Sequence, residues 1–186
     1  PMRLGRRLLR DAGRETTIYN LGIRAETSEG LKGRWLRDAE LRMVPEFPSV
    51  LMFCFGVNDA NHAQDRGEET TMRVSPSQSL ANATEIMSQA RDLAPNHTLW
   101  IAPQAVINGG KSSSVVNERL EGLNQLYGET AKGLGVPYLD VHAATLEDAE
   151  WQRGLRKGDG YHPGAEGYDR IADLIWNWDA WQKVFG

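Results

Sequence analysis

An aspartate and a histidine stand close together in the segment Asp159-Gly160-Tyr161-His162-Pro163. An imidazole can take a proton from a hydroxyl group and later return it to a leaving alkoxide. A carboxylate on its other ring nitrogen fixes the tautomer and stabilises the imidazolium that forms. The spacing therefore favours His162 as a general base that is oriented by Asp159. The plain alternative is that Asp159 caps a turn and that His162 is an ordinary surface residue.

A second group with chemical potential is the amide of Asn58, in the segment Gly56-Val57-Asn58-Asp59. It follows the most hydrophobic run of the chain, which predicts a loop directly after a buried strand. An amide that donates into an apolar pocket stabilises a tetrahedral oxyanion, by about 3–4 kcal/mol in serine hydrolases. The alternative is turn chemistry, with Asn58 in a left-handed conformation. We also expect Asp59 to cap the following segment and to hold the loop.

A third segment, residues 20–28, is expected to lead from a strand into a helix. Backbone N–H groups at the start of a helix have no partners within that helix. They can therefore bind an anionic oxygen. We expect Thr27 or Ser28 to cap the helix. The alternative is an ordinary strand-to-helix turn without a chemical role.

Helical and extended patterns alternate along the chain and must position these groups. Apolar residues at helical spacing, and runs of β-branched or aromatic residues, predict both kinds of element. Helices are expected at 1–13, 28–44, 77–93, 115–133 and 165–184, and strands at 16–21, 49–55, 97–102 and 137–141. The order contains no hairpin signal, so it predicts a parallel sheet between two layers of helices. In such folds ligands bind beyond the carboxyl ends of the strands, where the three segments converge.

The composition is that of an ordinary globular chain, and we expect one domain over residues 1–186. A net charge of −4 argues against a nucleic-acid partner. Five arginines among the first 14 residues predict a solvated helix face or, alternatively, a patch for an anionic ligand. No apolar run approaches the ~20 residues of a membrane span, and no signal peptide is recognisable. A cytoplasmic protein is therefore expected.

The single cysteine and three of the histidines are expected to have no chemical role. Cys54 lies in the fully apolar run 50–55 and cannot form a disulfide within the chain, so we expect it to be a small core residue. His62, His97 and His142 lack the spacing of metal ligands. The sequence therefore predicts no metal site.

Taken in order, the three segments resemble blocks of the SGNH hydrolases, also called the GDSL esterase/lipase family. That family carries a serine in an N-terminal Gly-Asp-Ser block, a glycine whose backbone N–H serves the oxyanion hole, a Gly-x-Asn-Asp block and a C-terminal Asp-x-x-His block. Residues 56–59 and 159–162 match the last two blocks. Residues 20–28 match the second, except that Ala25 stands in place of the glycine and Glu26 in place of an aspartate. Ala25 can still supply the N–H if its φ is negative.

The resemblance implies a flavodoxin-like three-layer α/β/α fold with a mostly parallel sheet of about five strands. It also implies ester hydrolysis without a cofactor, through an acyl-serine intermediate, on a small or lipid-like acyl ester. His162 and Asp159 are then the catalytic base and its orienting acid. Asn58 and the N–H of Ala25 form the oxyanion hole.

One block has no counterpart, because no Gly-Asp-Ser occurs in the 186 residues. In the family it follows the first strand, which lies inside the sheet, and removal of that strand would expose two unpaired edges. We therefore expect a sequence that is incomplete at its N-terminus, with the nucleophile upstream of Pro1. The alternatives are a non-catalytic binding module that has lost the serine, or a replacement nucleophile at Ser28 or residues 112–114. A nucleotide binder is disfavoured because no Gly-rich phosphate loop occurs.

Overall fold

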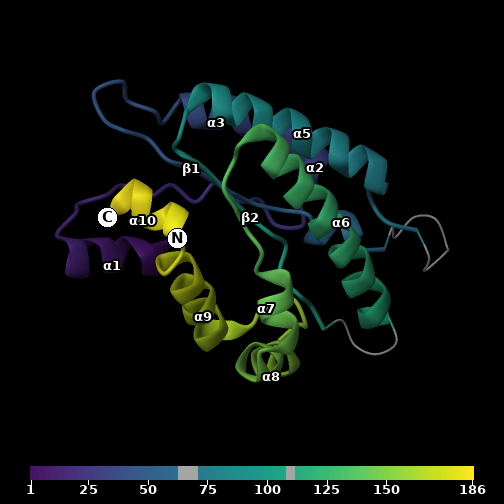
Figure 1. The fold of residues 1–186 in the computed structure, drawn as a ribbon. Coiled ribbons are helices and arrows are strands. Elements are labelled where there is room, and N and C mark those ends of the chain that lie inside the picture. Colours follow the sequence, from purple (N-terminus) through teal and green to yellow (C-terminus); the bar gives the residue numbers. More distant parts are fainter. Residues whose placement is uncertain (63–70, 108–111) are drawn as a thin grey trace.

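The computed structural model describes residues 1–62, 71–107 and 112–186. At its centre is a parallel sheet with β2 in the middle, formed by β1 (Leu51–Cys54), β2 (Thr98–Ile101) and β3 (Tyr138–Leu139). The register pairs Phe53 with Trp100, and Trp100 with Tyr138. Helices connect the strands, so all three strands end at the same edge of the sheet (Figure 1).

One face of the sheet carries aromatic side chains. It is covered by α2 (Ser28–Lys32), α3 (Trp35–Glu40), α4 (Val57–Ala60), α5 (Pro76–Leu93) and α6 (Ser112–Leu134). Trp100 is fully buried in this layer, and its ring centroid lies 5.6 Å from that of Phe55 and 4.8 Å from that of Tyr127. Aromatic contacts of this kind contribute about 0.5–1.5 kcal/mol beyond the burial of their area. This cluster is therefore the larger part of the core.

The other face packs against helices from the two ends of the chain. These are α1 (Met2–Ala12), α9 (Gly164–Trp176) and α10 (Asp179–Phe185). Because side chains alternate along a strand, Leu99 and Ile101 of β2 point to this face, into one buried cluster with Leu8 and Trp181. The expected three-layer α/β/α arrangement is thus confirmed (Figure 1). None of the helices in the described ranges has the length and apolar character needed to cross a membrane.

Two helices occupy the stretch before Asp159, where the sequence predicted no regular element. They are α7 (His142–Glu147) and α8 (Ala149–Lys157). The carboxylate of Asp148 caps α8 by accepting the N–H of Trp151 at 2.8 Å. The buried indole of Trp151 in turn donates to the carbonyl oxygen of Ala105 at 3.0 Å. α8 therefore braces the loop that follows β2.

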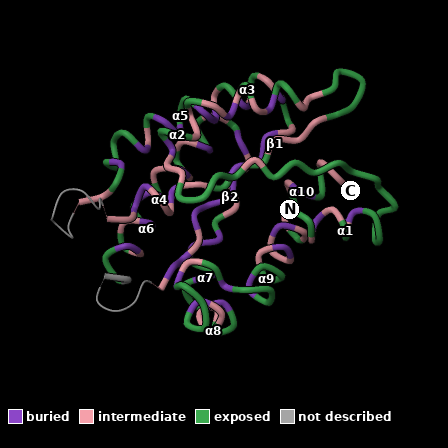
Figure 2. The backbone as a smooth tube through the Cα atoms, turned by 180° about the vertical axis from the view of Figure 1, so that it is seen from behind, coloured by how far each residue is buried: buried purple, intermediate pink, exposed green. Residues whose placement is uncertain are grey.

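Residues 16–21 do not form the expected strand. They follow an exposed, irregular path from α1 toward α2 (Figure 2). The described residues contain three strands rather than about five. A β-branched run favours an extended backbone, but a strand also needs a neighbour for its hydrogen bonds. Within the described residues, β1 pairs with β2 alone. Ile18 rests on α1 instead, where a Cβ on Gly5 would lie 2.7 Å from its Cδ1.

The strand β1 is also less buried than the sequence predicted. Met52 is 37% exposed and Cys54 is exposed as well, so Cys54 is not the core residue that the sequence predicted. Met52 pairs in register with the buried Leu99, which places both on one face, but only Leu99 lies in the middle strand. The apolar run therefore predicted the strand correctly but not the exposure of its side chains. That exposure depends on which elements cover the edge of β1, and the local sequence does not specify them.

Two arginines of α1 fasten it to α9. Arg3 pairs with Asp169, and Arg7 pairs with Asp173 at 2.6 Å. The guanidinium of Arg7 also lies over the ring of Trp176, 4.6 Å from its centroid. Partly exposed ion pairs contribute about 0–1 kcal/mol each, so these contacts orient α1 more than they stabilise it. Arg3 and Arg7 therefore do more than lie in solvent, as a solvated helix face would require. The acidic side chains of α9 occupy the positions that an anionic ligand would take.

The packing of Pro163 between two helices yields a stability test. A Cβ on Gly154 of α8 would clash with the carbonyl oxygen of Pro163. We expect Gly154→Ala to lower the free energy of unfolding by about 1–3 kcal/mol, because the backbone must shift to admit the methyl group. Urea denaturation followed by circular dichroism measures this.

Gly122→Ala on α6 is the matched control, because a methyl group there meets nothing within 4 Å. It should raise the free energy of unfolding by about 0.5–1 kcal/mol through its better helix propensity. Equal effects of the two substitutions would contradict the packing argument.

Candidate active site

The side chains of Asp159 and His162 form a hydrogen-bonded pair. Oδ2 of Asp159 lies 2.7 Å from Nδ1 of His162. An ionised carboxylate can only accept, so Nδ1 carries a proton, and in a neutral imidazole the lone pair is then on Nε2. The imidazole side chain is 63% exposed and the carboxylate side chain 53%. A reacting hydroxyl group can therefore approach Nε2 from solvent.

The loop of residues 159–163, called here the base loop, is fixed by its backbone. Gly160 has a φ of 83°, in the left-handed region that glycine tolerates best. Its N–H donates to the carbonyl oxygen of Leu155 at 3.2 Å, at the end of α8. Its carbonyl oxygen accepts the N–H of Ile107 at 2.7 Å, in the loop after β2. These contacts hold the base loop beyond the carboxyl end of the sheet, as the topology predicted.

The surroundings of Asp159 favour its ionised form. The hydrogen bond with His162 lowers its pKa most, and the backbone N–H groups of Tyr161 and His162, each 2.9 Å from Oδ1, lower it further. Together they bring the pKa of Asp159 to about 2. Asp159 therefore stays negative at any pH at which a histidine works as a base, and it can stabilise an imidazolium.

Asn58 lies in α4, directly after β1. Gly56 precedes it with a φ of 117°, and a Cβ on Gly56 would lie 3.2 Å from the ring of Tyr127. The left-handed residue of this turn is thus Gly56 and not Asn58, which removes the turn alternative for Asn58. Nδ2 of Asn58 donates to the carbonyl oxygen of Glu26 at 2.9 Å. The amide is thereby placed against the segment 23–26, called here the oxyanion turn.

Ala25 adopts a conformation that the sequence interpretation did not expect. Its φ is 59°, in the left-handed region, so the condition of a negative φ is not met. A non-glycine residue held there costs about 1–3 kcal/mol, which the surrounding contacts must offset. Nη1 of Arg73 donates to the Ala25 carbonyl oxygen at 3.0 Å, and Glu26 N–H donates to Ile23 at 3.3 Å. No hydrogen bond among the described residues uses the N–H of Ala25, so that group is available to a ligand.

Glu26 forms an ion pair that sequence reasoning missed. Its carboxylate binds the guanidinium of Arg34 through both oxygens, one of them 2.6 Å from Nε. Nη2 of Arg34 also donates to the carbonyl oxygen of Leu21 at 2.8 Å, and Nη1 binds Asp38 at 2.5 Å. Both partners are mostly buried, with 13% and 21% of their side chains exposed. This two-point contact fixes the oxyanion turn on α3.

Asp59 is fully buried and anchors α4 to its neighbours. Its Oδ1 accepts the N–H of Ser28 at 2.8 Å, and its Oδ2 accepts the hydroxyl of Ser79 at 2.5 Å. Asp59 was expected to cap the segment that follows it, but it caps α2, which lies earlier in the chain. Ser79 is also hydrogen-bonded to Tyr127 at 2.5 Å. Burial, followed by the charge of Asp59, raises the pKa of the Tyr127 phenol.

Of the serines considered as replacement nucleophiles, the structure describes the side chains of Ser28 and Ser114. Ser28 is fully buried, and its Oγ accepts a hydrogen bond from Asn82 at 3.0 Å. The side chains of Ser112 and Ser113 lie outside the described residues. Ser114 is exposed at the start of α6 and interacts with another group. Ser28 is therefore a structural residue.

The described residues contain no group of three or more His, Cys, Asp or Glu side chains that could share a metal ion. What the described residues do contain is a histidine oriented by a carboxylate, together with the N–H groups of Asn58 and Ala25. The base can move a proton at Nε2 of His162, and the donors can hold a developing negative charge. This set of groups suits acyl transfer from an ester.

The chain matches the GDSL-like Lipase/Acylhydrolase family over residues 1–170. No curated protein matches it. Among solved structures, a lipase/acylhydrolase from Enterococcus faecalis superposes with a TM-score of 0.72 at 20% identity, over 100% of this chain and 84% of that one.

Two further structures have the same fold. A mutant of Axe2, an acetyl-xylooligosaccharide esterase from Geobacillus, gives a TM-score of 0.73 at 18% identity, over 93% of this chain and 78% of that one. An α/β hydrolase from the metagenome of Lake Arreo in Spain gives 0.71 at 21% identity, over 94% and 78%. At these identities the likeness shows a shared fold.

The buried network around Asp59 predicts a specific loss of stability. Ser79→Ala should lower the free energy of unfolding by about 1–3 kcal/mol, because the Asp59 carboxylate loses a donor inside the core. Ser77→Ala on the same helix is the control. Ser77 is exposed, so its substitution should change the free energy by less than about 0.5 kcal/mol. Equal urea midpoints for the two variants would refute the anchoring role.

The pair of Asp159 and His162 predicts a measurable titration. Carbon NMR of the Asp159 carboxyl group should give a midpoint near 2, and His162→Ala should raise it, because the largest cause of the shift is removed. Since the folded pKa lies below the ordinary 3.8, the pair stabilises the fold above about pH 4 and loses this effect as the pH falls toward 2. His97→Ala should leave the midpoint unchanged. An unchanged midpoint in His162→Ala would rule out the pairing.

Proposed function

Because this chain belongs to the GDSL-like lipase/acylhydrolase family, we propose that it is a serine ester hydrolase that acts through an acyl-serine intermediate. The observation that carries the proposal is the pair of Asp159 and His162, with Nδ1 engaged and Nε2 open. Support also comes from Asn58, whose amide lies against the oxyanion turn.

His162 is the proposed proton carrier. Nε2 takes the proton of the serine hydroxyl while the serine oxygen forms a bond to the ester carbonyl carbon. The negative charge that moves to the carbonyl oxygen is held by the amide of Asn58 and the N–H of Ala25. The ester C–O bond then breaks, and the imidazolium returns its proton to the leaving alkoxide. Water repeats the sequence on the acyl-serine, with Asp159 ionised throughout.

The serine of this mechanism is proposed to precede Pro1, on a strand that pairs with the open edge of β1. The support is structural: β1 pairs only with β2 among the described residues, and Met52 at its edge is partly exposed. Residues 16–21 lie without a strand partner. A strand inserted at this edge would end beside α4 and bring its last residue toward the base loop.

The proposed substrates are esters of a small or lipid-like acyl group. Acetyl esters are the first choice for a test, because the structural neighbour Axe2 is named for its action on acetyl-xylooligosaccharides. The second candidate function is a binding module that has lost its nucleophile. The burial of Ser28 supports it, because this serine cannot reach a substrate and so does not replace the absent block.

Turnover of p-nitrophenyl acetate by the full-length protein tests the roles of the site residues. Asn58→Ala should lower kcat by about 10²–10³-fold, because one oxyanion donor is lost. His162→Ala should lower it by about 10²–10⁴-fold, because the proton carrier is lost. His97→Ala should leave kcat unchanged, because His97 is a partly exposed histidine that is hydrogen-bonded to Pro95. Undiminished turnover in His162→Ala would make the assignment wrong.

A fluorophosphonate reagent tests the nucleophile directly. We expect mass spectrometry of the labelled full-length protein to place the adduct on a serine upstream of Pro1, and residues 1–186 alone to remain unlabelled. A full-length protein that is folded, hydrolyses no ester and takes no label would instead support the binding module. Labelling of a serine within residues 1–186 would refute an upstream nucleophile.

A further inference from the structure

We propose that Tyr161 and Asn61 are positioning residues, and that the hydrogen bond between them fixes the position of the base loop relative to α4. The proposal rests on the proposed function, since it assigns a role to a contact between the two halves of that site. The phenol of Tyr161 donates to Oδ1 of Asn61 at 2.8 Å, across 100 positions of sequence. Tyr161 is the neighbour of His162, and Asn61 ends α4, which carries Asn58.

Within the base loop, the backbones of Tyr161 and His162 are held by the same carboxylate, that of Asp159. Both of their backbone N–H groups donate to Oδ1 of Asp159 at 2.9 Å, while Oδ2 binds the imidazole. The ring of Tyr161 is partly buried against the aromatic layer of the core. Burial, and then the charge of Asp159, raises the pKa of this phenol, so it remains a donor at neutral pH. The position of the ring therefore sets the position of the imidazole.

On the other side, Asn61 reaches the oxyanion turn through Arg73. The carbonyl oxygen of Asn61 accepts the backbone N–H of Arg73 at 2.8 Å. Nη1 of the same arginine donates to the carbonyl oxygen of Ala25 at 3.0 Å. Asn61 thus stands between the base loop and the backbone of the proposed oxyanion donor. A continuous series of contacts connects the base to the oxyanion turn.

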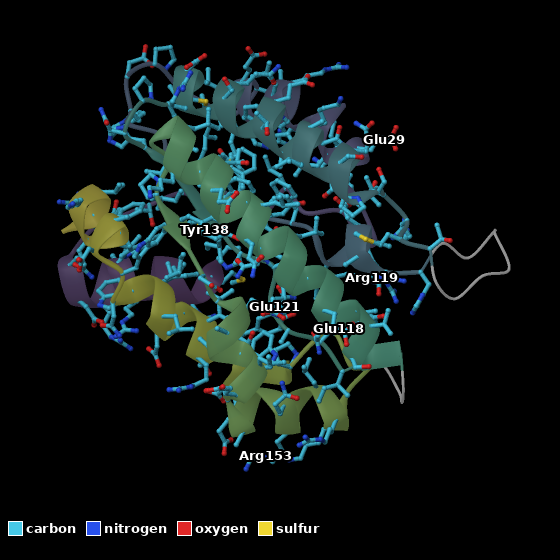
Figure 3. The ribbon with its side chains drawn as sticks, turned by 45° about the vertical axis from the view of Figure 1, so that its right-hand side comes forward. Glu29, Glu118, Arg119, Glu121, Tyr138 and Arg153 are labelled. Carbon is cyan, nitrogen blue, oxygen red and sulfur yellow. The ribbon has the colours of Figure 1, made fainter. Side chains whose placement is uncertain are left out.

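Each half of the site is also held without this hydrogen bond. Arg119, labelled in Figure 3, extends from α6 and donates to the carbonyl oxygen of Ala60 at 3.0 Å, and Asp59 anchors α4 to α2 and α5. The contact of Gly160 with Ile107 holds the base loop. Loss of the Tyr161 hydroxyl therefore leaves the base loop and α4 folded, but the distance between them is no longer fixed. A misplacement of about 1 Å between reacting groups can cost about 10²-fold in rate.

The chain offers a matched control of the same chemistry. The phenol of Tyr138, labelled in Figure 3, donates to Oδ1 of Asn124 at 2.6 Å. This second tyrosine–asparagine pair is also partly buried, but it joins β3 to α6, and its other side-chain hydrogen bond among the described residues goes to Asp140. Tyr138→Phe removes the same kind of hydrogen bond with no expected effect on the geometry of the site.

The experiment measures kcat and KM for p-nitrophenyl acetate in the full-length protein. Tyr161→Phe and Asn61→Ala should each lower kcat about tenfold with KM within about twofold, because binding is kept and geometry is lost. The double variant should be no slower than either single variant, since both remove one contact. Asn61→Asp keeps the accepting oxygen and should retain kcat within about threefold. Tyr138→Phe should stay within about twofold of the original kcat.

The positioning role is overturned if Tyr161→Phe keeps kcat within twofold, or loses no more than Tyr138→Phe. Amide NMR provides a readout that does not need turnover. Tyr161→Phe should shift the backbone signals of both His162 and Ala25, and Tyr138→Phe should shift neither. These shifts in a protein that hydrolyses no ester would refute the proposed function and leave the connection intact. An Ala25 signal that does not move would refute the connection itself.

Discussion

The carboxylate of Asp59 is the interaction on which the arrangement of the candidate site depends. It is fully buried, and it is satisfied by a backbone N–H of α2 and a hydroxyl of α5. A buried charge is tolerated only when such donors surround it, so α2, α4 and α5 must keep their relative positions. Asn58, the residue before it, is thereby brought against the oxyanion turn. A group without a part in the chemistry thus determines where the proposed oxyanion donors lie.

The second carboxylate, that of Asp159, works under opposite conditions. It is half exposed, and its low pKa comes from hydrogen bonds within three residues rather than from the core. Exposure leaves Nε2 of His162 open to a substrate, while the short local bonds keep the imidazole oriented. The carboxylate of Asp59 therefore fixes the positions of three helices, and the carboxylate of Asp159 orients the imidazole of His162. Tyr161 and Asn61 lie where these two systems meet.

Features of the site that depend on contacts within a few residues could be predicted from the sequence, and features that depend on contacts between distant residues could not. The pairing of Asp159 with His162 follows from their spacing, because a glycine turn brings residues three apart together. Asn58 could be placed after a strand because the run before it is strongly apolar. The position of Ala25 was predicted, but its left-handed φ was not, since Arg73 and Asn58 hold that turn from elsewhere in the chain. Residues 16–21 do not form the expected strand for the same reason. Their residue types favour an extended backbone, but a strand also needs a neighbouring strand, which the local sequence does not specify.

The sequence alone thus determined the family resemblance, the alternation of helices and strands, the three-layer fold and the local Asp-x-x-His pair. The resemblance rests on the three motif blocks, and the other features depend on periodicity and on contacts within a few residues. Only the tertiary structure decided that Asp59 caps α2, that Glu26 binds Arg34, that Cys54 is exposed at an open edge and that Tyr161 reaches Asn61. Such features arise from packing between elements far apart in the chain, and no local pattern encodes which distant groups will meet when the layers close on the sheet.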